Sequence, residues 1–172
     1  MTKYILIVLL LSSCTQKPKP LNPYHWYWET KSFILSESNL HADSTSVEKY
    51  GDGKTHKIKS IYRGHPTIEK WYRETGEQVA QINYSRDGQF ELRKEICKDG
   101  KPAFEGIFYK TEAYGPSTWW KCGKSKEEEG VRYKDRKIGV WKYWNNNGKV
   151  TETDYKNDNL IDSLLQIYGV DD

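Results

Sequence analysis

The sequence predicts an all-β fold: an elongated, open antiparallel meander of stacked β-hairpins. Turn dipeptides, most of them containing glycine, recur about every 12 residues, which leaves roughly eight residues for each strand, a common strand length. Aromatic residues recur at twice that distance, before alternate turns. The aromatic share is 14% and the mean hydropathy is −0.89, a composition typical of strands with one solvent-exposed face.

The first residues predict export. Lys3 precedes an apolar run from Tyr4 to Leu11, which is too short for a membrane span of about 20 residues. A short apolar run between a basic residue and small residues is typical of a secretory signal peptide. The run ends in Leu11-Ser12-Ser13-Cys14, which resembles the lipobox of bacterial lipoproteins.

The lipobox resemblance implies that residues 1–13 are a signal peptide and that Cys14 carries a thioether-linked diacylglycerol. The protein would then be anchored in the bacterial cell envelope, with the outer membrane as the expected location. Several acyl chains anchor a protein more firmly than one. Residues 14–23 contain three prolines and two lysines and are predicted to form an extended tether. An ordinary signal peptide with a coincidental cysteine is the alternative.

Residues 24–55 are predicted to form N-terminal capping strands, with residues 24–38 as an atypical strand pair. Trp26 and Trp28 alternate with His25 and Tyr27 in this stretch. Contact with a membrane interface is therefore a second interpretation of these tryptophans.

Residues 56–172 are predicted to form the repeat sheet. Five consecutive turns contain Gly53, Gly64, Gly76, Gly88 and Gly100. Their spacings are 11, 12, 12 and 12 residues, and glycine supplies the positive φ angles that tight hairpins require. Later turns are predicted at Cys122-Gly123, Asp135-Arg136, Asn147-Gly148 and Asp158-Asn159.

Aromatic residues before alternate turns define a period of 24 residues. Tyr72, Trp120, Trp144 and Tyr168 are separated by 48, 24 and 24 residues, and the missing copy falls at Glu95-Ile96. The residues assigned to the repeat are Trp71, Tyr72, Gly76, Tyr84, Gly88, Gly100, Trp141, Tyr143, Trp144, Gly148 and Tyr155.

The C-terminal segment is open to two interpretations. Residues 161–168 align with residues 137–144 at an offset of 24, which predicts a further strand. Leu160, Leu164 and Tyr168 also fit one face of a helix. The period favours the strand.

The pattern G-x-W-x-Y-[YW]-x-x-x-G-K-V over residues 139–150 resembles the MORN-repeat variant of YwqK-like bacterial proteins. The resemblance extends over residues 56–168 and is weakest between 110 and 130, where "TEAYGPSTWW" breaks the register. It implies a long, twisted, open antiparallel sheet in which each hairpin buries aromatic residues against the next. Some proteins of this kind are described as antitoxin components, which implies an alternative role in neutralising a toxin or in immunity.

Candidate binding residues lie where the period fails. Trp119 and Trp120, beside Pro116, form the candidate patch for a protein or a cell-wall glycan. The aromatic group of Trp141, Tyr143 and Trp144 is interpreted instead as packing between repeats. Cys97 and Cys122 are an even pair that would form a disulfide in an oxidising compartment, unless they are two separate buried thiols.

Other classes of function lack a sequence signal. The 27 basic and 24 acidic residues are interspersed, so no nucleic-acid footprint is predicted. No catalytic or metal-binding motif occurs, and we expect neither an enzyme nor a cofactor. The leading hypothesis is a non-catalytic, membrane-anchored envelope lipoprotein that binds a protein partner through its repeat surface.

Overall fold

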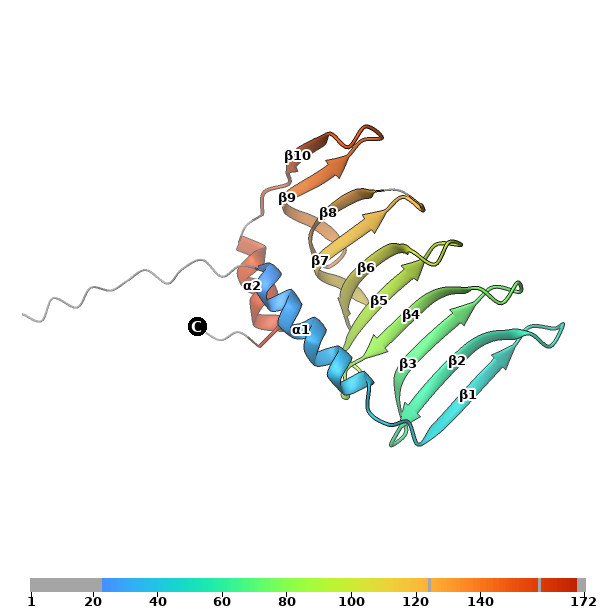
Figure 1. The fold of residues 1–172 in the computed structure, drawn as a ribbon. Helices are drawn as coiled ribbons and strands as arrows, with labels where there is room; N and C mark the ends of the chain where they lie inside the picture. The colour runs from blue at the N-terminus through green and yellow to red at the C-terminus, as the bar shows by residue number, and fades with distance from the viewer. Residues whose placement is uncertain (1–22, 124, 158, 170–172) are drawn as a thin grey trace, which may run out of the picture.

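The computed structural model describes residues 23–123, 125–157 and 159–169, and it confirms the predicted fold class. Ten strands form one open antiparallel sheet in chain order, and two helices lie against it (Figure 1). The elements are α1 (Pro23–Ser38), β1 (Ser44–Lys49), β2 (Thr55–Tyr62), β3 (His65–Tyr72), β4 (Gln78–Tyr84), β5 (Phe90–Ile96), β6 (Pro102–Tyr109), β7 (Glu112–Trp120), β8 (Lys126–Tyr133), β9 (Arg136–Trp144), β10 (Val150–Asp154) and α2 (Asn159–Ile167). Within the described ranges, no helix is both long enough and apolar enough to span a membrane.

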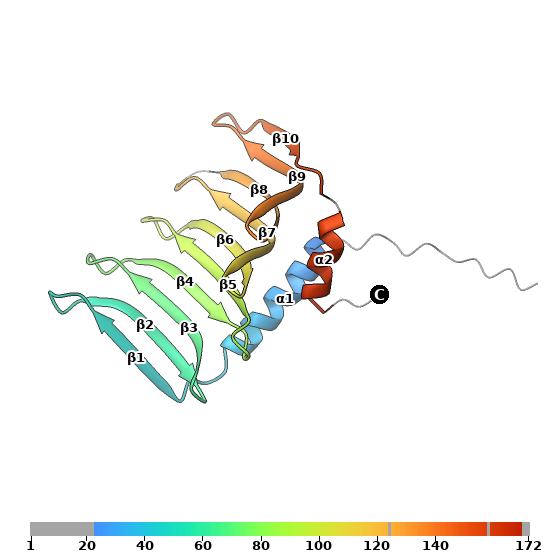
Figure 2. The same cartoon turned by 180° about the vertical axis from the view of Figure 1, so that it is seen from behind.

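The connections between strands reproduce the period of 24 residues. The turns after β3, β5, β7 and β9 begin at residues 73, 97, 121 and 145, and each is five residues long. Gly76 has a φ of +89°, and its N–H donates to the Arg73 carbonyl over 2.9 Å. These turns lie at the ends of the strands that are distant from the two helices (Figures 1 and 2).

The turns from β6 to β7 and from β8 to β9 carry no glycine. Lys110 and Thr111 connect β6 to β7 with φ angles of +49° and +74°. Because neither residue is a usual turn signal, the sequence did not predict this hairpin.

Irregular pairing recurs with the same period. The register shifts after Trp71, Glu95 and Trp119, just before three of the five-residue turns. β-bulges of this kind increase the local twist of a strand. Because the bulge recurs in successive repeats, it adds twist to each of these hairpins.

The prediction of a strand pair over residues 24–38 is wrong, because this stretch forms α1. Tyr27, Ile34 and Ser38 are all buried, and their spacings of seven and four residues place them on one helical face. The stretch also lacks the glycine or asparagine of a tight hairpin. Pro23, the last residue of the predicted tether, begins the helix, a position that proline favours.

The prediction of a strand over residues 161–168 is also wrong, because residues 159–167 form α2. Leu160 and Ile161 recur one turn later as Leu164 and Leu165, which is the period of a helix. Asp162 lies in the first turn of α2, where a negative charge is favourable.

The insertion "TEAYGPSTWW" does not interrupt the sheet, because residues 112–120 form β7. Its extra residues form a bulge, and the pairing passes from Gly106 with Ser117 to Phe108 with Ala113. A Cβ atom at Gly115 would lie 1.9 Å from the Tyr168 hydroxyl oxygen. The irregular stretch therefore makes room for the residue that follows α2, whose hydroxyl donates to the Tyr114 carbonyl over 2.8 Å.

The core lies between the two helices and one face of the sheet. Under α1, the buried cluster consists of Tyr27, Ile34, Leu92 and Ile107. Under α2, the buried cluster consists of Tyr114, Val131, Ile138 and Leu164. The helices therefore cover the face that carries Leu92 and Ile107.

A partly buried ion pair joins α1 to the sheet. Glu105 accepts a hydrogen bond from the Tyr27 hydroxyl over 2.8 Å and pairs with the ammonium groups of Lys31 and Lys94. Burial raises the pKa of Glu105, but the hydrogen bonds from Lys31 and Tyr27 and the charges of both lysines outweigh burial and hold it below its usual value. Glu105 is therefore ionised at neutral pH.

Candidate functional site on the open face of the sheet

The face of the sheet opposite the helices is not covered by either helix, and we refer to it as the open face. Successive side chains of a strand point to opposite faces. Leu92 points to the helices, so its neighbour Arg93 points to the open face. The same alternation places Phe104 and Trp119 on the open face, and their ring centroids are 4.6 Å apart.

Register aligns one row of side chains across the open face. Each member pairs directly with the next on the neighbouring strand, so all of them share one face. The row consists of Lys57, Trp71, Ala80, Glu95, Phe104, Trp119, Glu128, Tyr143 and Thr151.

Aromatic rings pack continuously along the second half of the sheet. The Trp119 ring lies 5.9 Å from the Trp141 ring, which lies 6.4 Å from the Tyr155 ring. Trp141 is fully buried although no helix covers it, and its indole N–H donates to the Val131 carbonyl over 3.0 Å. The Tyr143 and Tyr155 hydroxyls share a hydrogen bond of 2.7 Å.

Cationic side chains lie over these rings. The Arg132 guanidinium is 4.7 Å from the centre of Trp119 and 5.3 Å from that of Trp141. The Lys137 ammonium is 4.3 Å from the centre of Trp141. Such contacts contribute about 0.5–1 kcal/mol each at exposed sites and more when desolvated.

Lys137 is held in its charged form. Its ammonium donates to the Glu128 carboxylate over 2.6 Å and to the Tyr143 hydroxyl over 3.1 Å. Burial lowers the pKa of Lys137, but these hydrogen bonds and the Glu128 charge outweigh it, so the net pKa is raised. Lys137 therefore remains a cation well above neutral pH.

Arg132 is less completely satisfied than Lys137. One terminal nitrogen of its guanidinium donates to the Asp135 carbonyl over 2.6 Å. Its Nε atom is buried without a hydrogen-bond partner among the described residues.

The predicted patch of Trp119 and Trp120 is divided between two faces. Trp119 belongs to the open face, where Phe104 and Arg132 lie against its ring. Trp120 is the next residue of β7, so it points to the other face. The two rings do not form one platform.

Most residues assigned to the repeat lie at equivalent places. Strands β3, β4 and β9 end at Tyr72, Tyr84 and Trp144, and Trp71 and Tyr143 precede two of these strand ends. Gly76, Gly88, Gly100 and Gly148 lie in five-residue turns with positive φ angles. Cys14, the predicted lipidation site, lies outside the described residues.

A hollow of about 260 Å³ opens in the first half of the open face. Trp71, Phe104 and Phe108 contribute aromatic walls, and Ala80 and Ile82 contribute smaller side chains. Arg93 also lines the hollow, and its guanidinium lies 3.9 Å from the centre of the Phe108 ring. Lys94 and Glu95 complete the lining.

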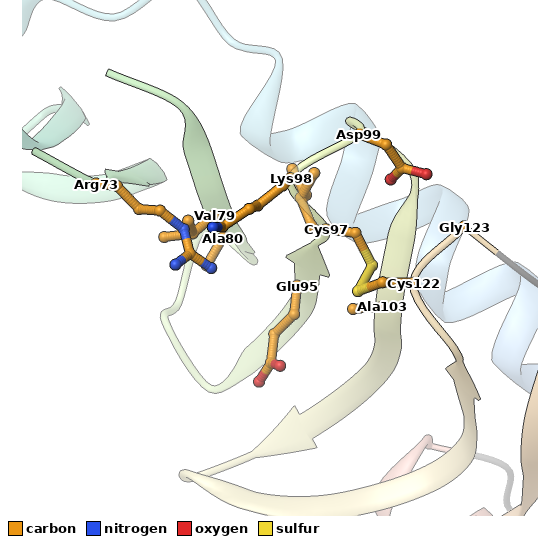
Figure 3. Close-up of a pocket in the computed structure, with 11 residues that line it drawn as sticks. Arg73, Val79, Ala80, Glu95, Cys97, Lys98, Asp99, Ala103, Cys122 and Gly123 are labelled. Carbon is orange, nitrogen blue, oxygen red and sulfur yellow. A yellow bond between two sulfur atoms is a disulfide. The ribbon is translucent and has the colours of Figure 1, made fainter. Parts of the chain in front are cut away.

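A wider groove of about 760 Å³ adjoins this hollow at the five-residue turns (Figure 3). Ala80 and Glu95 line both spaces. Arg73 and Lys98, from two successive turns, extend toward each other across the groove (Figure 3). The groove ends at Cys97 and Cys122.

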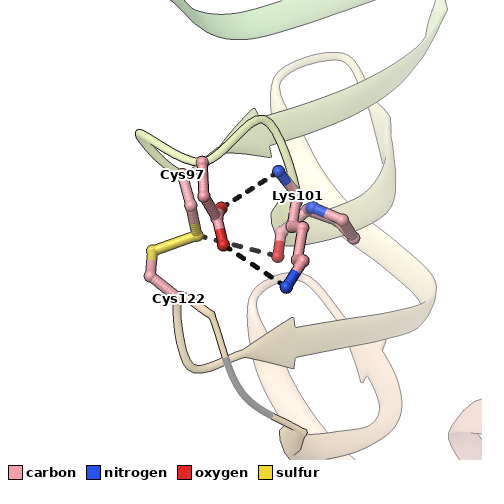
Figure 4. Close-up of a disulfide and its surroundings, with 5 residues drawn as sticks. Cys97, Lys101 and Cys122 are labelled. Atoms are coloured by element: carbon pink, nitrogen blue, oxygen red, sulfur yellow. Dashed lines mark hydrogen bonds and ion pairs between the residues drawn. A yellow bond between two sulfur atoms is a disulfide. The ribbon is translucent and has the colours of Figure 1, made fainter.

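Cys97 and Cys122 form a disulfide with a Cα–Cα distance of 5.4 Å (Figure 4). It joins the turn after β5 to the turn after β7. Asp99 in the first of these turns accepts a hydrogen bond from the Lys101 N–H over 3.1 Å. The disulfide therefore joins successive repeats at their turn ends.

Several residues of the open face could not be predicted from the sequence. Phe104, Arg132 and Lys137 carry no motif, and they meet the tryptophans only through cross-strand pairing. The spacing of Ala80, Phe104 and Glu128, 24 residues apart, is the signal that relates Phe104 to the row. Among the described residues, no three His, Cys, Asp or Glu side chains form a group suited to holding a metal ion.

Comparisons with known proteins assign no family to the chain. No protein-family model matches it, and no curated protein matches it. A solved structure described as the "Crystal structure of GtfA/B complex bound to UDP and GlcNAc" contains a chain with 8% identity and a TM-score of 0.29. The match covers 74% of this chain and 27% of that chain, so this chain spans about a quarter of that protein. At this TM-score the similarity supports no inference.

Proposed function

We propose that this protein is a non-catalytic, lipid-anchored protein of the bacterial cell envelope that binds a partner protein through the open face. The observation that carries the proposal is the packing of Arg132 over Trp119 and of Lys137 over Trp141 on the open face. Tryptophan, tyrosine and arginine are the residues most enriched at binding hot spots. The disulfide supports export, because disulfides persist in oxidising compartments.

A protein partner suits this face better than a glycan. A sugar ring needs an exposed aromatic plane, but Trp141 is buried and Arg132 lies against the Trp119 ring. The open face instead presents the charged groups of Arg132, Lys137 and Glu128 beside its aromatic rings. Such a mixed surface matches the composition of protein interfaces.

Lipid anchoring predicts a specific effect of Cys14→Ala. We expect the wild-type protein to incorporate labelled fatty acid and to sediment with membranes until detergent is added. Cys14→Ala removes the acceptor thiol, so it is expected to incorporate no label and to leave the membrane fraction or remain unprocessed. Fractionation and labelling of both proteins provide the measurement. A wild-type protein found in the soluble cytoplasmic fraction would contradict the anchoring proposal.

Partner binding predicts a face-specific crosslink. Thr153 pairs with Trp141 and is exposed on β10, so a photo-crosslinking residue there samples the open face. We expect a discrete protein adduct in cells from this position, and loss of that adduct when Lys137→Glu is added. The control position is Ser36, exposed on α1. An equal adduct from Ser36, or no adduct at Thr153, would count against binding through the open face.

A further inference from the structure

The row across the open face lacks rings at one hairpin. Positions 71, 95, 119 and 143 are equivalent in the period of 24, and they hold Trp, Glu, Trp and Tyr. The facing positions 80, 104 and 128 hold Ala, Phe and Glu. From β3 to β9, the adjacent strands β4 and β5 are the only pair with no ring at either of their positions in the row.

The absence of rings at Ala80 and Glu95 creates the hollow of about 260 Å³. Neighbouring strands are about 4.8 Å apart, so the three strand intervals from Trp71 to Phe104 span about 14 Å. Elsewhere along the open face, consecutive rings from Phe104 to Tyr155 are 4.6–6.4 Å apart. Ala80 and Glu95 therefore leave space in which a further ring can lie between Trp71 and Phe104.

The charges of the hollow restrict what enters it. Arg93 lies over the Phe108 ring and is paired with Glu91 at 2.6 Å. Glu95 is exposed, and among the described residues its carboxylate makes no ion pair or hydrogen bond in the structure. The rim thus offers a charged acceptor, whereas Arg93 disfavours a second cation inside.

We propose that the hollow receives one aromatic side chain of the partner protein, a tryptophan or tyrosine whose N–H or O–H donates to Glu95. Its volume of about 260 Å³ is below the roughly 300–1,000 Å³ of pockets for drug-sized ligands, which suits a single side chain. The partner's ring would continue the row that the chain itself interrupts, and the carboxylate complements a donor. This inference rests on the proposed function of the open face.

Titration with N-acetyl-tryptophanamide tests the proposal on the purified full-length protein. We expect saturable shifts of the Ala80 and Ile82 methyl NMR signals, with the millimolar affinity typical of one side chain. N-acetyl-leucinamide is the matched aliphatic probe and is expected to give no saturable shift. Equal binding of both probes, or no shift with either, would overturn the proposal.

Two substitutions at one position sharpen the test. Glu95→Trp supplies the missing ring from within the chain, so affinity for the tryptophan probe is expected to fall at least tenfold. Glu95→Gln keeps the space and removes only the charge, so it is expected to weaken the probe several-fold. Unchanged affinity in Glu95→Trp would show that the probe binds elsewhere and would refute the inference.

The outcome separates the two proposals. If a Thr153 adduct forms in cells but the hollow does not respond to the probe, partner binding stands and the aromatic insertion fails. If the probe binds the hollow but no adduct forms, the proposed function fails.

Discussion

Replacing Trp141 with alanine is expected to lower the free energy of unfolding by about 3–5 kcal/mol, the usual range for a fully buried tryptophan. Its ring lies directly over Gly130, where an added Cβ would be 2.4 Å from the indole. The Val131 carbonyl would also lose its donor, and an unsatisfied buried carbonyl is costly.

Urea unfolding followed by far-UV circular dichroism measures this loss without relying on tryptophan fluorescence. Val140→Ala is the matched control, because Val140 adjoins Trp141 on β9 and is half exposed; its effect is expected within about 0.5 kcal/mol, as for most surface sites. Trp141→Phe retains a ring but loses the N–H, so an intermediate value is expected. Equal effects of Trp141→Ala and Val140→Ala would contradict the packing.

The hairpin order could be predicted from the sequence because its signals are local. A glycine with a positive φ specifies its own turn. The spacing of 24 residues between aromatic strand ends can be read from the sequence without knowing which residues are in contact. The turn at Lys110 and Thr111 lacked this signal. The helices were missed for a different reason: Tyr27 and Ile34 are recognised as one face only when Leu92 and Ile107 lie opposite them.

The candidate site could be predicted only in part. Trp119 and Trp120 were predicted together as one candidate patch. Their separation onto two faces depends on the strand being continuous through the insertion, which the sequence did not predict. The hollow depends on pairings across β3, β4, β5 and β6. The sequence indicated that the aromatic residue of the period is missing at Glu95-Ile96. The register was needed to show that Trp71 and Phe104 lie on either side of the resulting hollow.

Removing the disulfide is the second change with a large expected effect. Cys97 and Cys122 are 25 residues apart, and closing a loop of this length restricts the unfolded chain by about 3–4 kcal/mol in the chain-entropy account. Cys97→Ala with Cys122→Ala is therefore expected to lower the free energy of unfolding by that amount. Alanine is the suitable replacement, because Cys97 is buried and a serine hydroxyl would need a partner.

Reduction provides the matched experiment on the unmodified chain. To reduce the bond completely, the wild-type protein is unfolded in urea with a reductant and refolded before its stability is measured. The reduced wild type is then expected to match the double-alanine variant, whereas reductant leaves the variant unchanged. Both forms should retain the circular dichroism of the sheet, because β6 and β7 stay paired along their lengths without the bond. If the fully reduced wild type, verified by alkylation of both thiols, is as stable as the oxidised protein, the bond does not stabilise the repeat stack, and its role is confined to holding the walls of the groove beside Arg73 and Lys98.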